Sequence, residues 1–259
     1  MVLFRGDVKS KSLQRRTTIS VILPADNVHF LQDSEEIVPQ PYKTLYFLHG
    51  LYGSDDIVLA NTSIQKFAED HGIAIVIPCG DNSFYLDNER AHAYYGEYVG
   101  QELLDITRNI FPLSDKREDT FIAGFSMGGY GAIRNGLKYH ENFSKIGMIS
   151  PALITDDIVN YADDNNVLRS RPYYESIFGN LDEIAGSDKD PKYLIDNCPD
   201  MPDIYMACGF DDFLYGKSVD FYSFLKSRDI DATFVEAEGE HNWDFCDKYL
   251  KEFIKTLNR

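Results

Sequence analysis

Runs of apolar residues along the chain alternate with segments in which apolar residues recur every three or four positions. A short run bounded by turn residues is typical of a strand, and the wider spacing is typical of an amphipathic helix. The predicted strands cover residues 16–23, 44–48, 73–77, 120–123, 145–149, 203–208 and 232–237. The predicted helices cover residues 61–71, 98–111, 217–228 and 242–257, and a further one follows residue 126.

Two of the predicted helices have a defined buried face. In the first, Asn61 or Thr62 is the expected N-cap, ahead of apolar residues at positions 64, 67 and 68. In the second, Pro112 ends the helix, and the apolar residues recur at spacings of four, three and four: Val99, Leu103, Ile106 and Ile110.

Strands that alternate with helices predict an α/β protein with a mostly parallel central sheet covered by helices on both faces. The sequence shows no internal repeat and no linker that would mark a second domain. We therefore expect residues 1–259 to form a single domain. Residues 27–42 and 80–96 have little periodicity and are predicted as loops, the second at the carboxyl end of the sheet.

Composition narrows the class of protein. The chain has 259 residues, of which 44% are hydrophobic and 14% aromatic, so it can bury a full core. A net charge of −17 argues against nucleic acid or an anionic membrane as partner and favours solubility. The first residues contain no long apolar run, so we expect a cytoplasmic location unless a processed leader precedes this sequence. We expect reduced thiols, not a metal site or disulfides, because the four cysteines lie far apart: Cys79, Cys198, Cys208 and Cys246.

The most specific chemical signal lies between residues 120 and 132. A predicted strand leads directly into the Gly-x-Ser-x-Gly segment Gly124 to Gly128, and small residues that can begin a helix follow. This arrangement is typical of a nucleophile elbow, in which a serine hydroxyl is exposed on a strained strand-to-helix turn. The five-residue pattern alone would fit an ordinary turn equally well. Its position between a strand and a helix makes Ser126 the candidate nucleophile.

A serine hydroxyl needs a base within hydrogen-bond reach and a carboxylate that orients the base. In folds built on this elbow the partners follow in the order serine, acid, histidine. His241 comes after the last predicted strand and is the candidate base, although alone it would be a helix-entry or surface histidine. His140 is the other histidine after Ser126, but it ends the helix that follows the elbow and lies on the wrong side.

The candidate acid is Asp212, which follows the predicted strand 203–208 at the carboxyl edge of the sheet. Asp211 is its neighbour and stays an alternative, although the Gly-x-x-Asp spacing from Gly209 favours Asp212.

The negative charge that develops on a carbonyl oxygen during acyl transfer requires backbone N–H donors. Met127, at the start of the helix after the serine, would provide one donor. Leu51, in the loop after the predicted strand 44–48, would provide the other. We expect His49 to be structural and to hold this loop.

Residues 150–202 are rich in Asp and Asn, have scattered aromatic residues and lack a sustained period. Long irregular insertions in compact domains are usually functional or mobile. We therefore predict a partly helical insertion over the active-site side of the sheet, and the alternative is a plain surface excursion.

Six segments carry a family resemblance: residues 47–53, 83–85, 111–114, 123–132, 208–214 and 239–243. In these segments the chain resembles the esterase D family of α/β-hydrolases, and within it the branch of small bacterial tributyrin, acetyl and feruloyl esterases. The matching segments span most of the chain, and several are more specific than the elbow alone. The resemblance implies an α/β-hydrolase fold and hydrolysis of short acyl esters without a metal or cofactor.

The resemblance also implies roles for particular residues. It implies a catalytic triad and an oxyanion hole, formed by Ser126, Asp212 and His241 and by the N–H groups of Leu51 and Met127. Tyr52 and Trp243 are candidates for substrate binding. Branch members often carry a second aromatic residue at the position near Cys246, and this chain departs from that pattern. The resemblance therefore does not identify the residues that form the pocket wall.

The implied substrates are small-molecule or carbohydrate esters, including acetyl esters and feruloyl-type esters of plant cell walls. Branch members often associate, so a homo-oligomer is a possible state. Three alternatives use the same fold: a thioesterase like S-formylglutathione hydrolase, an acyltransferase that delivers the acyl group to a sugar, and a catalytically silent binding protein.

Overall fold

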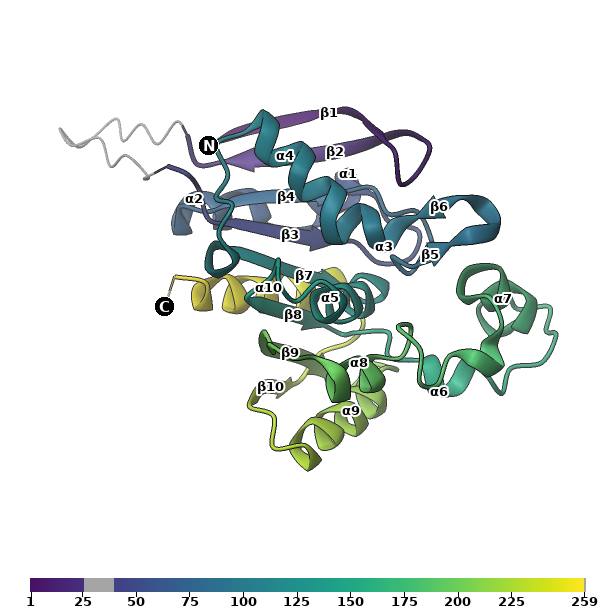
Figure 1. Cartoon of the computed structure of the whole chain (residues 1–259). Helices are drawn as coiled ribbons and strands as arrows, with labels where there is room; N and C mark the ends of the chain where they lie inside the picture. The colour runs from purple at the N-terminus through teal and green to yellow at the C-terminus, as the bar shows by residue number, and fades with distance from the viewer. Residues whose placement is uncertain (26–39, 259) are drawn as a thin grey trace.

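The computed structural model describes residues 1–25 and 40–258, and its centre is an eight-stranded sheet with helices on both faces (Figure 1). The strand order across the sheet is β1-β2-β4-β3-β7-β8-β9-β10. The strands are β1 (Val2–Ser10), β2 (Arg15–Leu23), β3 (Thr44–Leu48), β4 (Ala74–Pro78), β7 (Thr120–Phe125), β8 (Lys145–Ile149), β9 (Asp203–Gly209) and β10 (Ala232–Ala237).

Most neighbouring strands run parallel, as predicted. β1 pairs antiparallel with β2, and β2 pairs antiparallel with β4. All pairs from β4 to β10 are parallel. Their carboxyl ends therefore share one edge of the sheet, and the loops at that edge follow β3, β4, β7, β8, β9 and β10.

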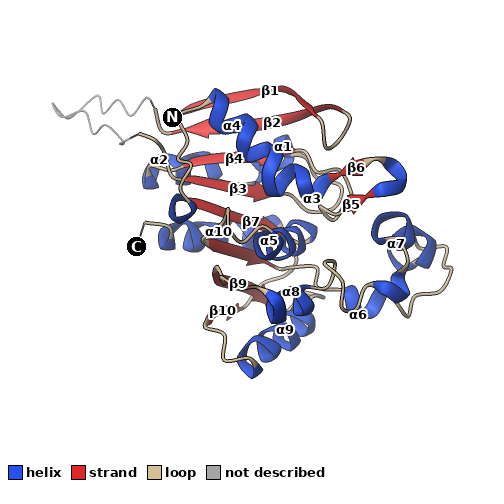
Figure 2. Ribbon diagram, viewed as in Figure 1, coloured by secondary structure: helices blue, strands red, loops and turns tan. Residues whose placement is uncertain are grey.

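Helices lie on both faces of the sheet (Figure 2). On each face they enclose a separate apolar core. Successive side chains of a strand point to opposite faces, so Tyr46 of β3 joins one core while Leu45 and Phe47 join the other. The first core is covered by α3 (Tyr95–Glu97), α4 (Leu103–Ile110), α5 (Met127–Lys138) and α9 (Tyr215–Ser227). The second is covered by α1 (Asp55–Asn61), α2 (Ile64–His71) and α10 (Trp243–Thr256).

Two predicted helices differ in detail from the structure. The predicted helix 61–71 is two helices, because α1 ends at Asn61 with Thr62 as its C-cap and α2 begins after Ser63. In the predicted helix 98–111, a π-helical turn spans Tyr98–Glu102 ahead of α4. A π turn rotates the face that follows it. Leu104 and Thr107 are therefore buried, whereas Ile110 is 58% exposed.

The segments with little periodicity contain short elements. Within residues 80–96, β5 (Asp87–Asn88) and β6 (Ala93–Tyr94) form a small hairpin. Residues 150–202 contain α6 (Thr155–Ile158), α7 (Arg171–Phe178) and α8 (Pro191–Asn197). Figure 1 shows α6 and α7 beyond the carboxyl ends of the parallel strands. The predicted loop at 27–42 lies largely outside the described residues, and no helix in the described part of the chain is long and apolar enough to cross a membrane.

Candidate active site

Ser126 lies on the turn between β7 and α5 with backbone angles of φ 57° and ψ −117°. Such positive φ values are strained for a residue with a side chain. The turn requires small neighbours. A Cβ atom on Gly124 would collide with the backbone of Gly128, and one on Gly128 would collide with the carbonyl of Leu48. The glycines thus let α5 begin directly against the strands, and this places Ser126 at the carboxyl edge of the sheet.

The structure brings Ser126, His241 and Asp212 together from three separate loops. His241 Nε2 lies 3.0 Å from Ser126 Oγ, and His241 Nδ1 lies 2.9 Å from Asp212 Oδ2. An ionised carboxylate only accepts hydrogen bonds, which assigns the ring proton to Nδ1 and leaves the Nε2 lone pair facing the serine hydroxyl.

Asp212 is held in a fixed orientation and in its ionised form. Its side chain is fully buried, and its Oδ1 accepts the N–H of Leu214 at 2.8 Å. Burial favours the neutral carboxyl, but hydrogen bonds, including those from His241 and Leu214, outweigh burial and hold the pKa of Asp212 below its ordinary value. Asp211, the sequence alternative, is exposed, and its N–H donates to the Gly239 carbonyl at 3.1 Å.

The loop after β3 packs directly on the serine. A Cβ atom on Gly50, the residue before Leu51, would lie 3.3 Å from the Cβ of Ser126. Met127 is the first residue of α5 on the other side. Neither amide N–H of Leu51 and Met127 donates to an acceptor within residues 1–25 and 40–258. Two unused backbone donors in the segments that flank the candidate nucleophile are the kind of group that stabilises a developing oxyanion.

His49 fixes this loop from inside the protein. Its buried ring donates from Nδ1 to the Gly50 carbonyl at 2.7 Å, and its Nε2 accepts the N–H of Gly80 at 2.8 Å. Tyr85 donates its hydroxyl to the His49 carbonyl at 3.0 Å. This neutral ring has one donor and one acceptor nitrogen, and both are in use.

Aromatic rings surround the imidazole. Phe125 stacks on His241 with ring centroids 4.8 Å apart, and Trp243 packs against Phe125 at 5.1 Å. Phe213 lies 4.6 Å from His241 and is 77% exposed. Tyr52 is 71% exposed and donates its N–H to Asn82 Oδ1 at 2.8 Å. Trp243 therefore supports the base through Phe125, while Phe213, which was not predicted as a site residue, forms an open aromatic wall.

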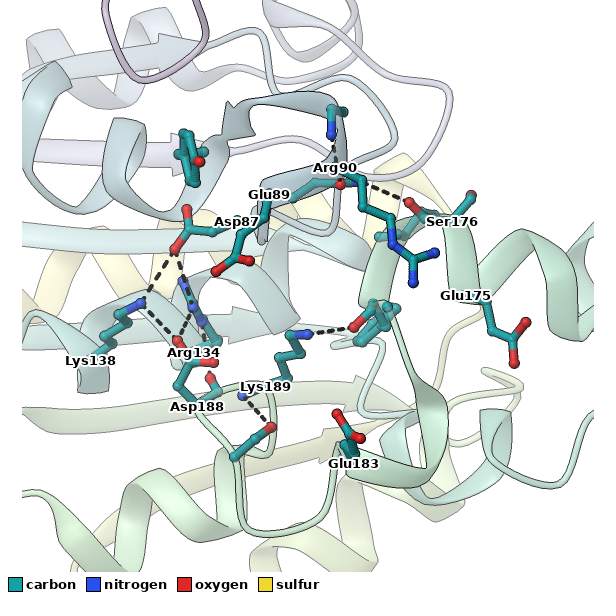
Figure 3. Close-up of a pocket in the computed structure, with 17 residues that line it drawn as sticks. Asp87, Glu89, Arg90, Arg134, Lys138, Glu175, Ser176, Glu183, Asp188 and Lys189 are labelled. Atoms are coloured by element: carbon teal, nitrogen blue, oxygen red, sulfur yellow. Dashed lines mark hydrogen bonds and ion pairs between the residues drawn. The ribbon is translucent and has the colours of Figure 1, made fainter.

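A separate cavity of about 800 Å³ lies between the β5–β6 hairpin, α5 and α7 (Figure 3). Ser126, His241 and Asp212 do not line it. On its wall, Arg134 of α5 is almost wholly buried and contacts Asp188 at 2.5 Å and Asp87 at 3.6 Å. Lys138 contacts the same two carboxylates at 2.7 and 3.3 Å. These ion pairs join the hairpin and the 150–202 segment to the helix that begins at Met127.

The remaining features considered in the sequence are His140, the four cysteines and a metal site. His140 follows the far end of α5, where its carbonyl accepts a hydrogen bond from Arg117 at 2.8 Å. All four cysteines are free thiols. Among the described residues there is no group of three or more His, Cys, Asp or Glu side chains that could hold a metal ion.

A mostly parallel sheet with a serine on a strand-to-helix turn, beside a histidine and an aspartate, defines the α/β-hydrolase class. The chain belongs to the esterase family, whose model, described as "Putative esterase", matches residues 10–245. It is a carboxylic ester hydrolase with an α/β-hydrolase fold, which confirms both the predicted fold and the resemblance stated for the sequence.

Named relatives and solved structures extend this similarity over the full chain. An acetyl esterase of Caldicellulosiruptor saccharolyticus is 41% identical over 264 residues, which cover 100% of this chain and 99% of that protein. A fluorophosphonate-binding serine hydrolase of Staphylococcus aureus superposes with a TM-score of 0.86 at 32% identity, covering 100% and 98% of the two chains. An S-formylglutathione hydrolase of Staphylococcus aureus superposes with a TM-score of 0.84 at 31% identity, covering 100% and 99%.

Proposed function

We propose that the chain is a serine carboxylesterase that hydrolyses short-chain acyl esters, acetyl esters foremost, with Ser126 as nucleophile, His241 as base and Asp212 as orienting acid. The observation that carries this proposal is the unbroken hydrogen-bonded line from Ser126 Oγ through His241 to Asp212, with distances of 3.0 and 2.9 Å. Both distances lie within the range required for proton transfer.

The proposed reaction proceeds through an acyl-enzyme. His241 Nε2 takes the proton of Ser126 as Oγ attacks the carbonyl carbon of the ester. The N–H groups of Leu51 and Met127 stabilise the oxyanion of the tetrahedral intermediate. The intermediate collapses, and His241 returns the proton to the departing alcohol. A water molecule, deprotonated by His241, then attacks the acyl-enzyme and releases the acid.

The acyl group that we propose is acetyl, because the full-length relative at 41% identity is named as an acetyl esterase. We further propose that the substrate is an ester of a carbohydrate alcohol or a feruloyl-type cell-wall ester. Exposed aromatic side chains at Tyr52 and Phe213 suit contact with a sugar face or a phenolic ring. Trp243 packs mainly on Phe125, so we propose that it acts indirectly on the pocket.

A second candidate is a thioesterase that acts on S-formylglutathione. It is favoured by the structural neighbour of that name at 31% identity. The same serine, histidine and aspartate would perform this reaction, so the site geometry does not separate the two substrates. Transfer of the acyl group to a sugar in place of water uses the same acyl-enzyme.

The proposal includes the organisation of the chain. We propose one domain over residues 1–259, with residues 150–202 over the active-site side of the sheet. Two bonds support this: Asn88 donates to the Ser176 carbonyl at 2.7 Å, and Tyr130 donates to the Lys189 carbonyl at 2.6 Å. We propose a cytoplasmic location, which is supported by the free thiols of all four cysteines. We also propose that copies of the chain can associate as a homo-oligomer.

One substrate panel tests the proposed function. It compares kcat/KM for p-nitrophenyl esters from acetate to octanoate, methyl ferulate, acetylated xylan and S-formylglutathione. We expect acetyl esters to be preferred over octanoate and over S-formylglutathione. A preference for S-formylglutathione would replace the proposal with the thioesterase. If the folded protein hydrolysed none of them and a fluorophosphonate probe failed to label it, the chain would be a binding protein.

A further inference from the structure

Ser150 lies between the strand that carries the nucleophile and the strand that leads to the acid. It directly follows β8, which lies between β7 and β9 in the sheet. The carbonyl of Ile149 accepts the N–H of Ser126 at 3.0 Å, and Ser150 donates its own N–H to the Ala207 carbonyl of β9 at 2.7 Å. The backbone at Ser150 is thus joined to both sides of the catalytic centre.

Both the backbone conformation of Ser150 and the burial of its hydroxyl group are energetically unfavourable. Its φ is 45°, in the left-handed region, and the residue is completely buried. Its Oγ is buried and makes no hydrogen bond of standard geometry within the described part of the chain. Buried hydroxyl groups almost always have a partner, and backbone strain is concentrated at functional sites.

Asp212 lies just after β9, the strand to which the backbone of Ser150 is hydrogen-bonded. Its buried carboxylate accepts one N–H at Oδ1, from Leu214, and one at Oδ2, from His241, although a carboxylate has about four acceptor positions. Burial raises the pKa of Asp212, and the Ser150 hydroxyl is among the groups that oppose this effect and lower that pKa.

Cys208 of β9 is the competing neighbour, because the Ser150 hydroxyl also lowers the pKa of this thiol. Burial raises the pKa of Cys208 to about 11, so the thiol stays neutral at physiological pH. A neutral sulfur is a much weaker acceptor than an ionised carboxylate. The other titratable group in contact with Asp212, His241, donates its own proton to Oδ2, so the carboxylate is a stronger acceptor for the serine proton than the neutral thiol.

We propose that Ser150 is a positioning residue of the catalytic triad, whose buried hydroxyl rotates to donate to the Asp212 carboxylate and keeps Oδ2 directed at His241. This role rests on the proposed function, because it requires Asp212 to act through His241. Ser150 does not touch the substrate. Its effect is to restrict the carboxylate and to share the negative charge that would otherwise face the imidazole.

Two substitutions separate the hydroxyl from the backbone. Ser150→Ala removes the hydroxyl and keeps the strained φ, whereas Ser150→Gly removes the hydroxyl and suits a left-handed backbone. We expect both variants to lose about tenfold in kcat/KM on p-nitrophenyl acetate. We also expect the acidic limb of the pH profile to move to higher pH in both, because a carboxylate without this donor stabilises the imidazolium more strongly. Ser150→Gly keeps the test valid if Ser150→Ala does not fold.

The matched control is Ser20→Ala. Ser20 is also fully buried and donates to a buried carboxylate at 2.6 Å, but this carboxylate belongs to Asp55 and not to the triad. We expect this variant to lose thermal stability and to keep the wild-type pH profile. In an Asp212→Asn background, Ser150→Ala should lower activity no further.

Three results would overturn the role of Ser150. They are an unmoved acidic limb in both variants, full activity of Ser150→Gly beside an impaired Ser150→Ala, and an undiminished effect of Ser150→Ala in the Asp212→Asn background. Failure of the proposed function is a different result, since it would appear as full activity of Ser126→Ala.

Discussion

The imidazole of His241 stacks on the ring of Phe125, with centroids 4.8 Å apart and planes 25° apart. Phe125 is the last residue of β7 and immediately precedes Ser126. One strand end therefore presents the serine and also supports the histidine that bonds to it. We infer that the distance between the candidate nucleophile and base depends on this aromatic contact as well as on the bond to Asp212.

Phe125→Leu removes the stacking ring and keeps an apolar side chain. We expect kcat to fall about tenfold or more, because a small displacement of the base disturbs proton transfer. The matched control is Phe121→Leu, which lies on the same strand and in the same core but away from the histidine. If the two variants lose the same thermal stability but only Phe125→Leu loses kcat, the result would agree with a role of Phe125 in holding His241. Equal kcat in the two variants would contradict it.

The proposed role of Asp212 as the acid is tested by a pair of neighbouring substitutions. Asp212→Asn removes the charge that stabilises the imidazolium and permits the wrong ring tautomer, so we expect kcat to fall roughly a thousandfold or more. Asp211→Asn changes an exposed carboxylate, and we expect activity near wild type. The measurement is steady-state hydrolysis of p-nitrophenyl acetate by both variants. The assignment would be reversed if Asp211→Asn were the inactive one.

We expect the buried ring of His49 to make the free energy of unfolding depend on pH. Burial, opposed in part by the bond to Gly50, lowers the pKa of His49 below its ordinary value. The unfolded imidazole has a pKa of about 6.5, so the unfolded chain takes up the proton first as pH falls. We therefore expect the free energy of unfolding to decrease as pH falls below about 6.5, until the lower folded-state pKa is reached.

Chemical denaturation at pH 7.5 and at pH 5.5 measures this effect. His49→Gln should be less stable than wild type at the higher pH and should show a smaller difference between the two conditions. His92→Gln is the control, because His92 is exposed and should leave the difference unchanged. If the difference in the free energy of unfolding between pH 7.5 and pH 5.5 were as large in His49→Gln as in the wild type, other groups would be responsible for it.

The glycines of the elbow have no room for a side chain, whereas Gly216 in α9 is surrounded by open space. Gly128→Ala places a methyl group against the Leu48 carbonyl, so we expect a lower melting temperature and a displaced serine. Gly216→Ala in α9 meets open space, and better helix propensity should raise stability by up to about 1 kcal/mol. Thermal melts of the two variants provide the comparison. A melting temperature for Gly128→Ala equal to that of Gly216→Ala would show that the elbow tolerates a side chain.

The parts of this structure that sequence predicts well are those encoded locally. The apolar runs gave the parallel strands, since a strand buried on both faces is apolar throughout. The edge strand Val2–Ser10 was not predicted, because most of its side chains are exposed and its few apolar residues neither alternate nor form a long run. The face of the helix at 98–111 was partly wrong, because periodicity assumes regular turns and the π turn at Tyr98–Glu102 shifts the register.

The candidate site divides in the same way. The order of Ser126, Asp212 and His241 is readable because this fold places its functional side chains after particular strands. Phe213 was within a recognised segment, yet its position over the imidazole depends on how two distant loops meet. The ion pairs of Arg134 with Asp87 and Asp188 join three separate parts of the chain, and no spacing in the sequence encodes them.

The central claim is that the hydroxyl of Ser126 becomes covalently acylated during turnover. The most direct measurement is mass spectrometry of peptides from protein quenched in acid during hydrolysis of p-nitrophenyl acetate, with Ser126→Ala treated in parallel. We expect one acetyl group on the peptide that contains Ser126 and neither acetylation nor appreciable turnover in Ser126→Ala. Wild-type turnover by Ser126→Ala, or acetylation of a different residue during turnover, would contradict the account.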